Sequence, residues 1–300
     1  MVEKIYDCAI IGGGPAGVTA AIYLSRANKS VVLFEKEIIG GQINNSPCVE
    51  NIPGFDTISG QDYGIKLMDQ LEYNNIDVIY DEVINVSSVG VKIISTYSKE
   101  CYFAKSVIIA SGTKHRTLNL ENEDKLIGNG ISFCVKCDGA FYKDKDVAII
   151  GGGNSALQEA IELSSIAKHV LILQDLDHLT GENKLQEKIK AIDNISVKTG
   201  VNVIRYISYN DKLVGLEVTK HADKYIIDID GVFLAIGLVP NNKPFKDVVN
   251  LNSYGYIDSV NDFSGVYAAG DCLQDAVRQV VTAEASGVLA ANKVIKFLEK

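Results

Sequence analysis

Two cysteines three positions apart, Cys134 and Cys137, have the spacing of a redox-active pair. Thiols at this separation can close a small ring as a disulfide. In cytosolic proteins such pairs are redox centres or half of a metal site. A zinc site would need a second such pair or suitably spaced histidines, but no second pair occurs and the four histidines are scattered. The spacing therefore predicts thiol–disulfide chemistry and no metal site, with inert thiols as the alternative.

A carboxylic acid, Asp138, directly follows the second cysteine. A carboxyl group beside a dithiol is well placed to shuttle the proton that thiol–disulfide exchange requires. We expect Cys134, Cys137 and Asp138 to be the catalytic residues. A cap or turn role for Asp138 is the alternative.

A glycine-rich turn, GGGPAG, stands near the N-terminus and contains Gly12, Gly14 and Gly17. The apolar segment IYDCAII before it predicts a strand, and VTAAIYLSRA after it predicts a helix. Glu35 stands at the end of the next predicted strand. Such glycines let the backbone approach a pyrophosphate at a helix N-terminus, while the acid binds a ribose. The turn therefore predicts a dinucleotide site, and a tight turn without a ligand is the alternative.

The same strand–turn–helix–strand plan returns at residues 146–175, where aligning Gly12 with Gly151 places Glu35 on Gln174. The segment after residue 245, GVYAAGDC and a helix over about 278–298, has no such start of its own. We therefore expect an α/β protein with two Rossmann-like domains, the second inserted in the first. The predicted FAD-binding domain comprises 1–115 and 246–300, and the inserted domain, which carries the cysteine pair, comprises 116–245.

Composition excludes several other classes of protein. The net charge of −9 disfavours nucleic acid as a partner. The N-terminus does not have the pattern of a signal peptide, and no apolar run approaches the roughly 18 residues of a membrane span, so we expect a cytoplasmic protein. Four isolated cysteines are expected to be packing or surface residues. They are Cys8, Cys48, Cys101 and Cys272.

Essentially the whole chain resembles the low-molecular-weight thioredoxin reductases. The resemblance is carried, in order, by GGGPAG, GGQINNSPCVENIPG (40–54), ASGTKHR (110–116), FCVKCDG (133–139), GGGNSA (151–156), GVFLAIGLVPN (231–241) and AAGDCLQDAVRQVVTA (268–283). It implies FAD as cofactor, a homodimer and thioredoxin as the disulfide substrate. It also implies that Cys137 faces the flavin, that Cys134 attacks thioredoxin and that Asp138 is the acid. Val135-Lys136 departs from the Ala-Thr that is commoner between the cysteines.

The resemblance further implies a set of FAD-binding residues. Gln42 and Asn51 would lie near the flavin, and Asp271, which follows a predicted strand, would lie near the ribityl chain with Arg278 and Gln279. The full set is Gly12, Gly14, Pro15, Ala16, Gly17, Glu35, Lys36, Gly41, Gln42, Asn51, Val83, Gly112, Gly270, Asp271, Arg278, Gln279 and Val280.

The expected electron donor departs from the common family pattern. NADPH-dependent relatives carry a His-Arg-Arg run and a further Arg at the positions occupied here by Gln174, Asp175, Leu176 and Thr180. Lysines would have kept a phosphate-binding charge, whereas Asp175 would repel a 2′-phosphate. The ferredoxin-dependent flavin thioredoxin reductases lack the same arginines, so we expect ferredoxin to be the donor.

Other readings of the sequence stay open. Asp175 could bind the free 2′-hydroxyl of NADH, and NADPH is the less favoured nicotinamide donor. A reductase for another small disulfide protein is a third reading. From a different class of function, the chain could be a flavoprotein that senses redox state through Cys134 and Cys137 without turnover.

Overall fold

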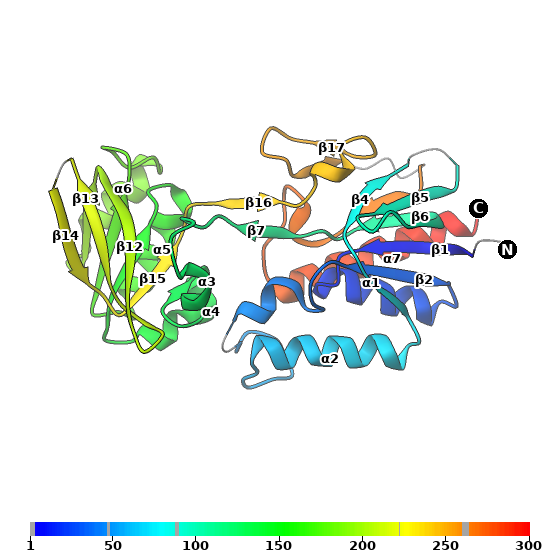
Figure 1. Cartoon of the computed structure of the whole chain (residues 1–300), viewed down its shortest axis with the longest axis horizontal. Coiled ribbons are helices and arrows are strands. Elements are labelled where there is room, and N and C mark those ends of the chain that lie inside the picture. The colour runs from blue at the N-terminus through cyan, green and yellow to red at the C-terminus, as the bar shows by residue number, and fades with distance from the viewer. Residues whose placement is uncertain (1–3, 47–48, 88–89, 222, 260–263) are drawn as a thin grey trace. The chain divides into compact units, whose positions relative to one another are not determined.

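The computed structural model describes residues 4–46, 49–87, 90–221, 223–259 and 264–300, so Cys48 lies outside the described residues. The chain forms two compact units. The first comprises Met1–Asn44, Ile52–Lys114 and Val239–Lys300, and the second comprises Asn45–Asn51 and His115–Leu238. The predicted fold is confirmed: each unit is an α/β layer structure with a mainly parallel sheet, and the second is inserted in the first (Figure 1).

The first unit is built on a seven-stranded sheet in the order β3-β2-β1-β6-β5-β4, with β19 paired to β6. The strands β1, β2, β3, β6 and β19 are parallel, whereas β4 and β5 are antiparallel to their neighbours. The bounds are β1 Ile5–Ile11, β2 Val31–Glu35, β3 Asp77–Tyr80, β4 Val83–Val86, β5 Lys92–Thr96, β6 Cys101–Ile109 and β19 Val266–Ala268. Strands β1 and β2 are almost continuously apolar and buried, as a parallel sheet covered on both faces requires.

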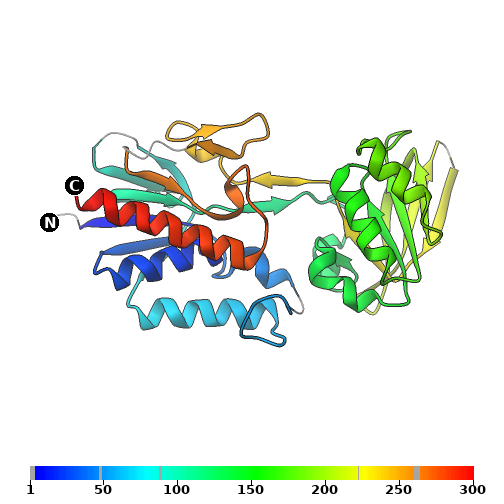
Figure 2. The same cartoon turned by 180° about the vertical axis from the view of Figure 1, so that it is seen from behind.

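Three helices accompany this sheet: α1 (Pro15–Arg26), α2 (Gly60–Tyr73) and α7 (Val280–Leu298). Helix α1 begins at a proline, which suits a first helical position because its missing N–H would have no partner there. Figure 2 shows α7 running beside α1, and the two helices pack closely. A Cβ on Gly287 of α7 would lie 2.2 Å from the carbonyl oxygen of Ala16, so only glycine permits this approach.

Short elements complete the first unit. They are the 3-10 helices η1 (Gly41–Asn45), η3 (Lys243–Phe245) and η4 (Gly270–Cys272) and the strand pair β17 (Asn250–Leu251) and β18 (Ile257–Ser259). The predicted helix over about 278–298 begins two residues later, at Val280. One apolar cluster of the core contains residues of β1, β2, β4, β5, β6 and β19 and includes Phe34, Ile109 and, from η3, Phe245.

The second unit contains a five-stranded parallel sheet in the order β11-β10-β9-β15-β8 and an antiparallel sheet in the order β12-β13-β14. The strands are β8 Ile131–Ser132, β9 Asp146–Ile150, β10 His169–Gln174, β11 Ile195–Thr199, β12 Val201–Tyr209, β13 Lys212–Lys220, β14 Asp223–Asp228 and β15 Gly231–Leu234. The helices are α3 Glu123–Leu126, α4 Val135–Asp138, η2 Gly139–Tyr142, α5 Asn154–Ser164 and α6 Asn183–Lys190. Two apolar clusters form its core, one of them between the parallel sheet and α5.

Two strands carry the chain between the units, and they pair with each other: β7 (Thr113–His115) and β16 (Leu238–Pro240). Next to them, the Arg116 amide donates to the Gly237 carbonyl oxygen at 3.0 Å. Residues 239–245, which the sequence assigned to the inserted domain, group with the first unit. The reason is that Asn242 and Phe245 are buried in that unit. No helix in the part of the chain that the structure describes is long and apolar enough to span a membrane.

Candidate functional site

The first glycine-rich turn connects β1 to α1 and depends on the absence of side chains. Gly12 has φ of +112°, and a Cβ there would lie 2.2 Å from the carbonyl oxygen of Ala110. A Cβ on Gly17 would lie 1.9 Å from the carbonyl oxygen of Gly12. Gly14, by contrast, could carry a Cβ without a clash, because its nearest neighbour would be the Gly40 carbonyl oxygen at 3.9 Å, and no side chain caps the N-terminus of α1. The first amides of the helix therefore remain available to an anion.

Glu35 ends β2 beside this turn and is only 8% exposed. Its Oε2 accepts from the Gly13 amide at 2.7 Å, and its Oε1 accepts from the Glu37 amide at 2.8 Å. These two bonds fix the carboxylate against the glycine-rich turn. A carboxylate held in this way retains lone pairs that can accept hydrogen bonds from the two hydroxyls of a ribose.

Asp271 lies on η4, directly after β19. Gly270 precedes it with φ of +79°, and its amide donates to the Ser286 hydroxyl of α7 at 2.9 Å. Burial raises the pKa of the Asp271 carboxyl, and the positive charge of Arg278 partly offsets this. Arg278 lies over the ring of Tyr256, 4.9 Å from its centroid. The structure thus brings Gly270, Asp271 and Arg278 together in the first unit.

The remaining predicted FAD-binding residues occupy varied surroundings. Gly41 and Gln42 begin η1, Gly112 has φ of +61°, and Gln279 and Val280 stand at the start of α7. Lys36 is exposed and pairs with Glu37, whereas Val83 is part of the buried core. Asn51 belongs to the segment Asn45–Asn51 of the second unit.

A buried asparagine, Asn242, was not anticipated from the sequence. It is 0% exposed and links three segments of the first unit. Its Nδ2 donates to the carbonyl oxygens of Gly255 and Cys272 at 3.0 Å each, and its Oδ1 accepts from the Ser111 hydroxyl at 2.8 Å. Asn242 therefore holds η4, and with it Asp271, against the end of β6. In the sequence, the polar pair Asn241-Asn242 after Pro240 is the only feature that points to this role.

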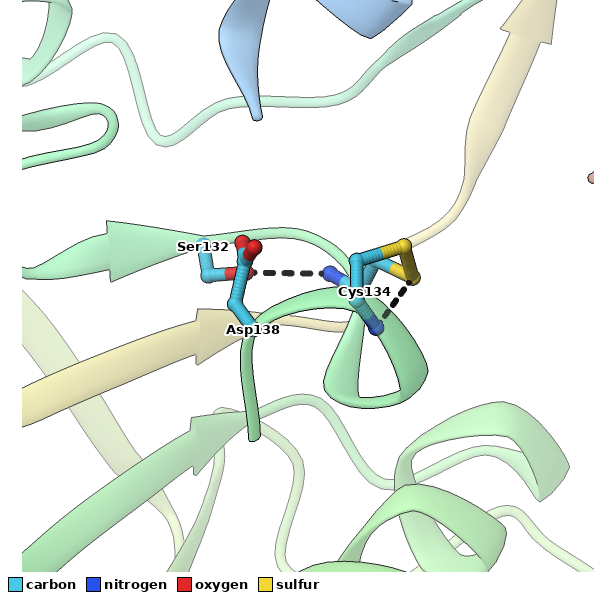
Figure 3. Close-up of a disulfide and its surroundings, with 4 residues drawn as sticks. Ser132, Cys134 and Asp138 are labelled. Carbon is cyan, nitrogen blue, oxygen red and sulfur yellow. Dashed lines mark hydrogen bonds between the residues drawn. A yellow bond between two sulfur atoms is a disulfide. The ribbon is translucent and has the colours of Figure 1, made fainter. Parts of the chain in front are cut away.

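In the second unit, the disulfide predicted between Cys134 and Cys137 is present. Cys134 is the residue before the short helix α4, and both sulfur-bearing residues are partly exposed. The Cys137 amide donates to Cys134 Sγ at 3.2 Å (Figure 3). Between the cysteines, Val135 is buried in the core while Lys136 is exposed.

Asp138 ends α4 and is 7% exposed. Its Oδ2 accepts from the Ser132 hydroxyl at 2.5 Å, while its Oδ1 is buried and has no hydrogen-bond partner among the described residues. Burial raises the pKa of this carboxyl, and the Ser132 hydrogen bond lowers it. Asp138 thus directly follows the disulfide in the chain, and its surroundings on balance raise the pKa of its carboxyl.

The second glycine-rich turn connects β9 to α5. Gly151 has φ of +130°, and a Cβ there would lie 2.5 Å from the Ala235 carbonyl oxygen. Gln174, 5% exposed, packs against Gly152. The loop after β10 folds onto the turn, because the amides of Thr180 and Gly181 donate to the Gly152 carbonyl oxygen at 2.8 and 2.9 Å.

The same loop brings acidic groups to this turn. Asn154, the first residue of α5, exchanges two hydrogen bonds with Glu182, at 3.0 and 2.7 Å. Asp175 and Asp177 are exposed, and the Asp175 carboxylate accepts from the Leu176 amide at 2.9 Å. Between Gln174 and Asn183 the sequence has three acids and no lysine or arginine. Apart from His178, this segment therefore offers no basic side chain for a phosphate.

Comparison with known proteins assigns the chain to a family. A family model described as pyridine nucleotide-disulphide oxidoreductase matches residues 6–287. The chain belongs to this family. A thioredoxin reductase from Bacillus subtilis (strain 168) is 38% identical and covers 99% of this chain and 96% of its own length. A 34.2 kDa protein in the rubredoxin operon of Clostridium pasteurianum is 37% identical, with 99% and 98% covered.

Solved structures agree with this assignment. The crystal structure of a thioredoxin reductase from Streptococcus pyogenes MGAS5005 has a TM-score of 0.92 and 35% identity, and it covers 98% of each chain. The resemblance to the low-molecular-weight thioredoxin reductases is therefore confirmed. For this member of the family, the first glycine-rich turn, the buried Glu35 and the Asp271–Arg278 pair fit a flavin dinucleotide, since they offer an open helix N-terminus, a ribose acceptor and further polar groups.

Proposed function

We propose that this protein is an FAD-dependent thioredoxin reductase that takes its electrons from reduced ferredoxin. The observation that carries the reductase is the Cys134–Cys137 disulfide, which the buried Asp138 directly follows in the chain. Membership of the pyridine nucleotide-disulphide oxidoreductase family and the whole-length similarity to thioredoxin reductases support it. FAD would be held by the set of first-unit residues predicted above, with Gly12, Gly14, Gly17 and Glu35 at the pyrophosphate and ribose.

The two cysteines and Asp138 have different roles in disulfide exchange. Opening the Cys134–Cys137 disulfide consumes two electrons and two protons, and FAD held by the residues named above would supply the electron pair. Cys134 Sγ accepts the Cys137 amide hydrogen, and an amide donor stabilises a thiolate there. That thiolate attacks the thioredoxin disulfide, forming a mixed disulfide. Cys137 then displaces the reduced thioredoxin and re-forms the intramolecular bond, while Asp138 donates and recovers a proton.

The donor is inferred from the segment that follows β10. A 2′-phosphate requires charge-assisted donors, which arginine or lysine supplies. Here Asp175 and Leu176 are exposed at the positions where NADPH-dependent relatives carry arginines. Glu182 adds a further acid, which is hydrogen-bonded to Asn154, the first residue of α5. Ferredoxin needs no nucleotide site, and two ferredoxins, each giving one electron, balance one disulfide.

The test is an anaerobic titration of the oxidised, FAD-loaded protein with thioredoxin present as acceptor. NADPH, NADH and photoreduced ferredoxin are added separately while flavin absorbance and new thioredoxin thiols are followed. We expect flavin bleaching and thioredoxin reduction with ferredoxin alone. Rapid bleaching by NADPH or NADH would overturn ferredoxin as donor but leave the reductase intact.

NADH is the second candidate donor, because the exposed Asp175 carboxylate could accept a hydrogen bond from a 2′-hydroxyl. The redox-sensing alternative is separated by turnover: a sensor would exchange disulfides once, whereas a reductase regenerates thiols as long as the donor lasts. The proposed enzyme is cytoplasmic and forms a homodimer. Light scattering of the purified FAD-loaded protein would test the homodimer. A monomer in that measurement would remove this part of the proposal.

A further inference from the structure

The backbone of the loop between η4 and α7 is fixed on both sides of Arg278. The Thr282 hydroxyl lies within hydrogen-bond distance of the carbonyl oxygens of Val277 and Gln279. The Gln279 amide also donates to the Val277 carbonyl oxygen at 2.7 Å. These bonds determine where the Arg278 side chain starts, but they leave the position of its charge to other contacts.

The ring of Tyr256 is the contact that orients this charge. The central carbon of the Arg278 guanidinium lies 4.9 Å from the ring centroid, inside the roughly 6 Å over which a cation is attracted to an aromatic face. Within the described ranges of the chain, the guanidinium forms no ion pair and no hydrogen bond. Its N–H donors are therefore available to a ligand.

The turn that carries Tyr256 is anchored to the loop that carries Arg278. The Tyr256 amide donates to Asn252 Oδ1 at 3.0 Å, and Asn252 Nδ2 donates to Gln274 Oε1 at 2.7 Å. The Gln274 amide in turn donates to the Ile257 carbonyl oxygen at 3.0 Å. None of these bonds uses the tyrosine ring, so we expect the two segments to stay together when the ring is removed.

The loop with Arg278 begins beside the N-terminus of α1. A Cβ on Gly270 would lie 2.8 Å from the Cβ of Ala16, the second residue of α1. Burial raises the pKa of Asp271 and the positive charge of Arg278 lowers it, so the guanidinium lies within electrostatic reach of this carboxyl. Because no side chain caps α1, its N-terminus is the place that the proposed function gives to the FAD pyrophosphate. A guanidinium nearby can act as a charge-assisted donor for an anionic cofactor.

We propose that Tyr256 is a positioning residue for FAD, whose ring holds the Arg278 guanidinium ready to donate hydrogen bonds to the cofactor. The inference rests on the proposed FAD-dependent function, and it adds a residue outside the predicted FAD-binding set. Without the ring, the long arginine side chain would sample many rotamers in solvent, and ordering it on binding would cost affinity. Tyr256 thus acts through Arg278.

The test measures FAD affinity without electron donor or thioredoxin. Full-length apoprotein is titrated with FAD at a series of salt concentrations, and quenching of flavin fluorescence gives the dissociation constant. We expect Arg278→Met to weaken binding about tenfold and Tyr256→Leu about fivefold. Tyr256→Phe, which keeps a ring, should bind like wild type. Because the lost interaction is between charges, the affinity of both weakened variants should depend less on salt than that of wild type.

Two further variants separate positioning from a structural role. In the Arg278→Met background, Tyr256→Leu should cause no further loss, because both changes act through one guanidinium. The matched control is Tyr254→Leu in the same turn, which removes a ring that is 80% exposed and should leave FAD affinity unchanged.

Three outcomes would overturn the inference: wild-type affinity in Tyr256→Leu, losses that simply add in the double variant, or a loss in Tyr256→Phe as large as in Tyr256→Leu. Failure of the wild-type protein to bind FAD would instead overturn the proposed function.

Discussion

The two glycine-rich turns of this chain share a backbone but differ in the side chains around them. Gly12 and Gly151 both have positive φ, and a Cβ on either would strike a carbonyl oxygen of a segment that follows another strand. Both turns lead into helices without a side-chain cap. In both turns a carbonyl oxygen accepts a hydrogen bond from the loop after the next strand. The Gly40 amide donates to the Gly13 carbonyl oxygen in the first turn, and the Thr180 amide donates to the Gly152 carbonyl oxygen in the second.

The difference lies at the end of that next strand. Glu35 accepts from the Gly13 amide in the first turn, whereas the aligned residue of the second is a neutral Gln174 packed on Gly152. Beyond it the second loop adds Asp175 and Glu182. The backbone of such a turn is therefore required by the packing of strand and helix, and its persistence says little about a ligand. The ligand is decided by a few side chains after the strand.

The largest expected effect comes from adding a methyl group to each turn. Gly12→Ala and Gly151→Ala should each lower the free energy of unfolding by about 3 kcal/mol, because both place a Cβ against a carbonyl oxygen at positive φ. Only Gly12→Ala should also abolish FAD binding. Thermal melting and the flavin content of the purified proteins measure the two effects. Loss of FAD from Gly151→Ala as well would show that the second turn takes part in holding the flavin.

The next effect concerns the two strand-end residues. Glu35→Ala should weaken FAD binding about 30-fold, roughly 2 kcal/mol, since it removes a buried charged acceptor. Gln174→Ala, its counterpart, should leave FAD affinity unchanged. Titration of the apoprotein with FAD, followed by quenching of flavin fluorescence, gives both constants. Equal losses in the two variants would contradict the assignment of FAD to the first turn.

Positive charges that would bind a 2′-phosphate can be introduced beside the second turn. Asp175→Arg combined with Leu176→Arg should raise the rate of flavin bleaching by NADPH about tenfold over wild type, because guanidinium groups bind a 2′-phosphate. The check is anaerobic stopped-flow absorbance. A control, Asp223→Arg, makes the same charge reversal as Asp175→Arg on an exposed strand of the same unit and should have no effect. If the wild-type protein already bleaches rapidly with NADPH, the arginines are not required.

The smallest expected effect is a pH-dependent change in stability, and it concerns a difference between the helices that follow the two turns. Glu159 of α5 aligns with Ala20 of α1; its Oε2 is buried without a hydrogen-bond partner among the described residues, and its pKa is raised to about 7 by burial and by Glu162. The unfolded chain releases this proton at lower pH, so the free energy of unfolding falls between about pH 4.5 and pH 7.

Glu159→Gln should therefore melt a few degrees higher than wild type at pH 8, about 1 kcal/mol, and like wild type near pH 4.5. Melting curves across this range provide the measurement. The exposed Glu187 of α6 offers a control, because Glu187→Gln should shift the curves equally little at every pH. A pH-independent gain in Glu159→Gln would mean that packing, and not ionisation, limits stability at this position.

Regular patterns made most of the fold predictable. Buried parallel strands are apolar throughout, and the glycine turns punctuate them, so both βαβ units, the insertion and the Cys134–Cys137 disulfide follow from the sequence. The polar contacts could not be predicted from the sequence, because they depend on how side chains are oriented in the fold and not on a regular spacing of residues. Ser132 resembles any serine before a turn, and Asn242 any loop asparagine, until burial and partners are known. The partial burial of Glu159 was likewise hidden in an amphipathic helix.

The paired strands β7 and β16 have a consequence for how such a protein can change. Arg116 and Gly237, separated by 121 positions in sequence, are joined by a backbone hydrogen bond, so the inserted segment 115–238 begins and ends at one place. A segment that enters and leaves at one pair of strands can accumulate mutations without changing the strand order of the first unit's sheet. An enzyme built in this way can alter where its electrons come from while the machinery that stores them is left untouched.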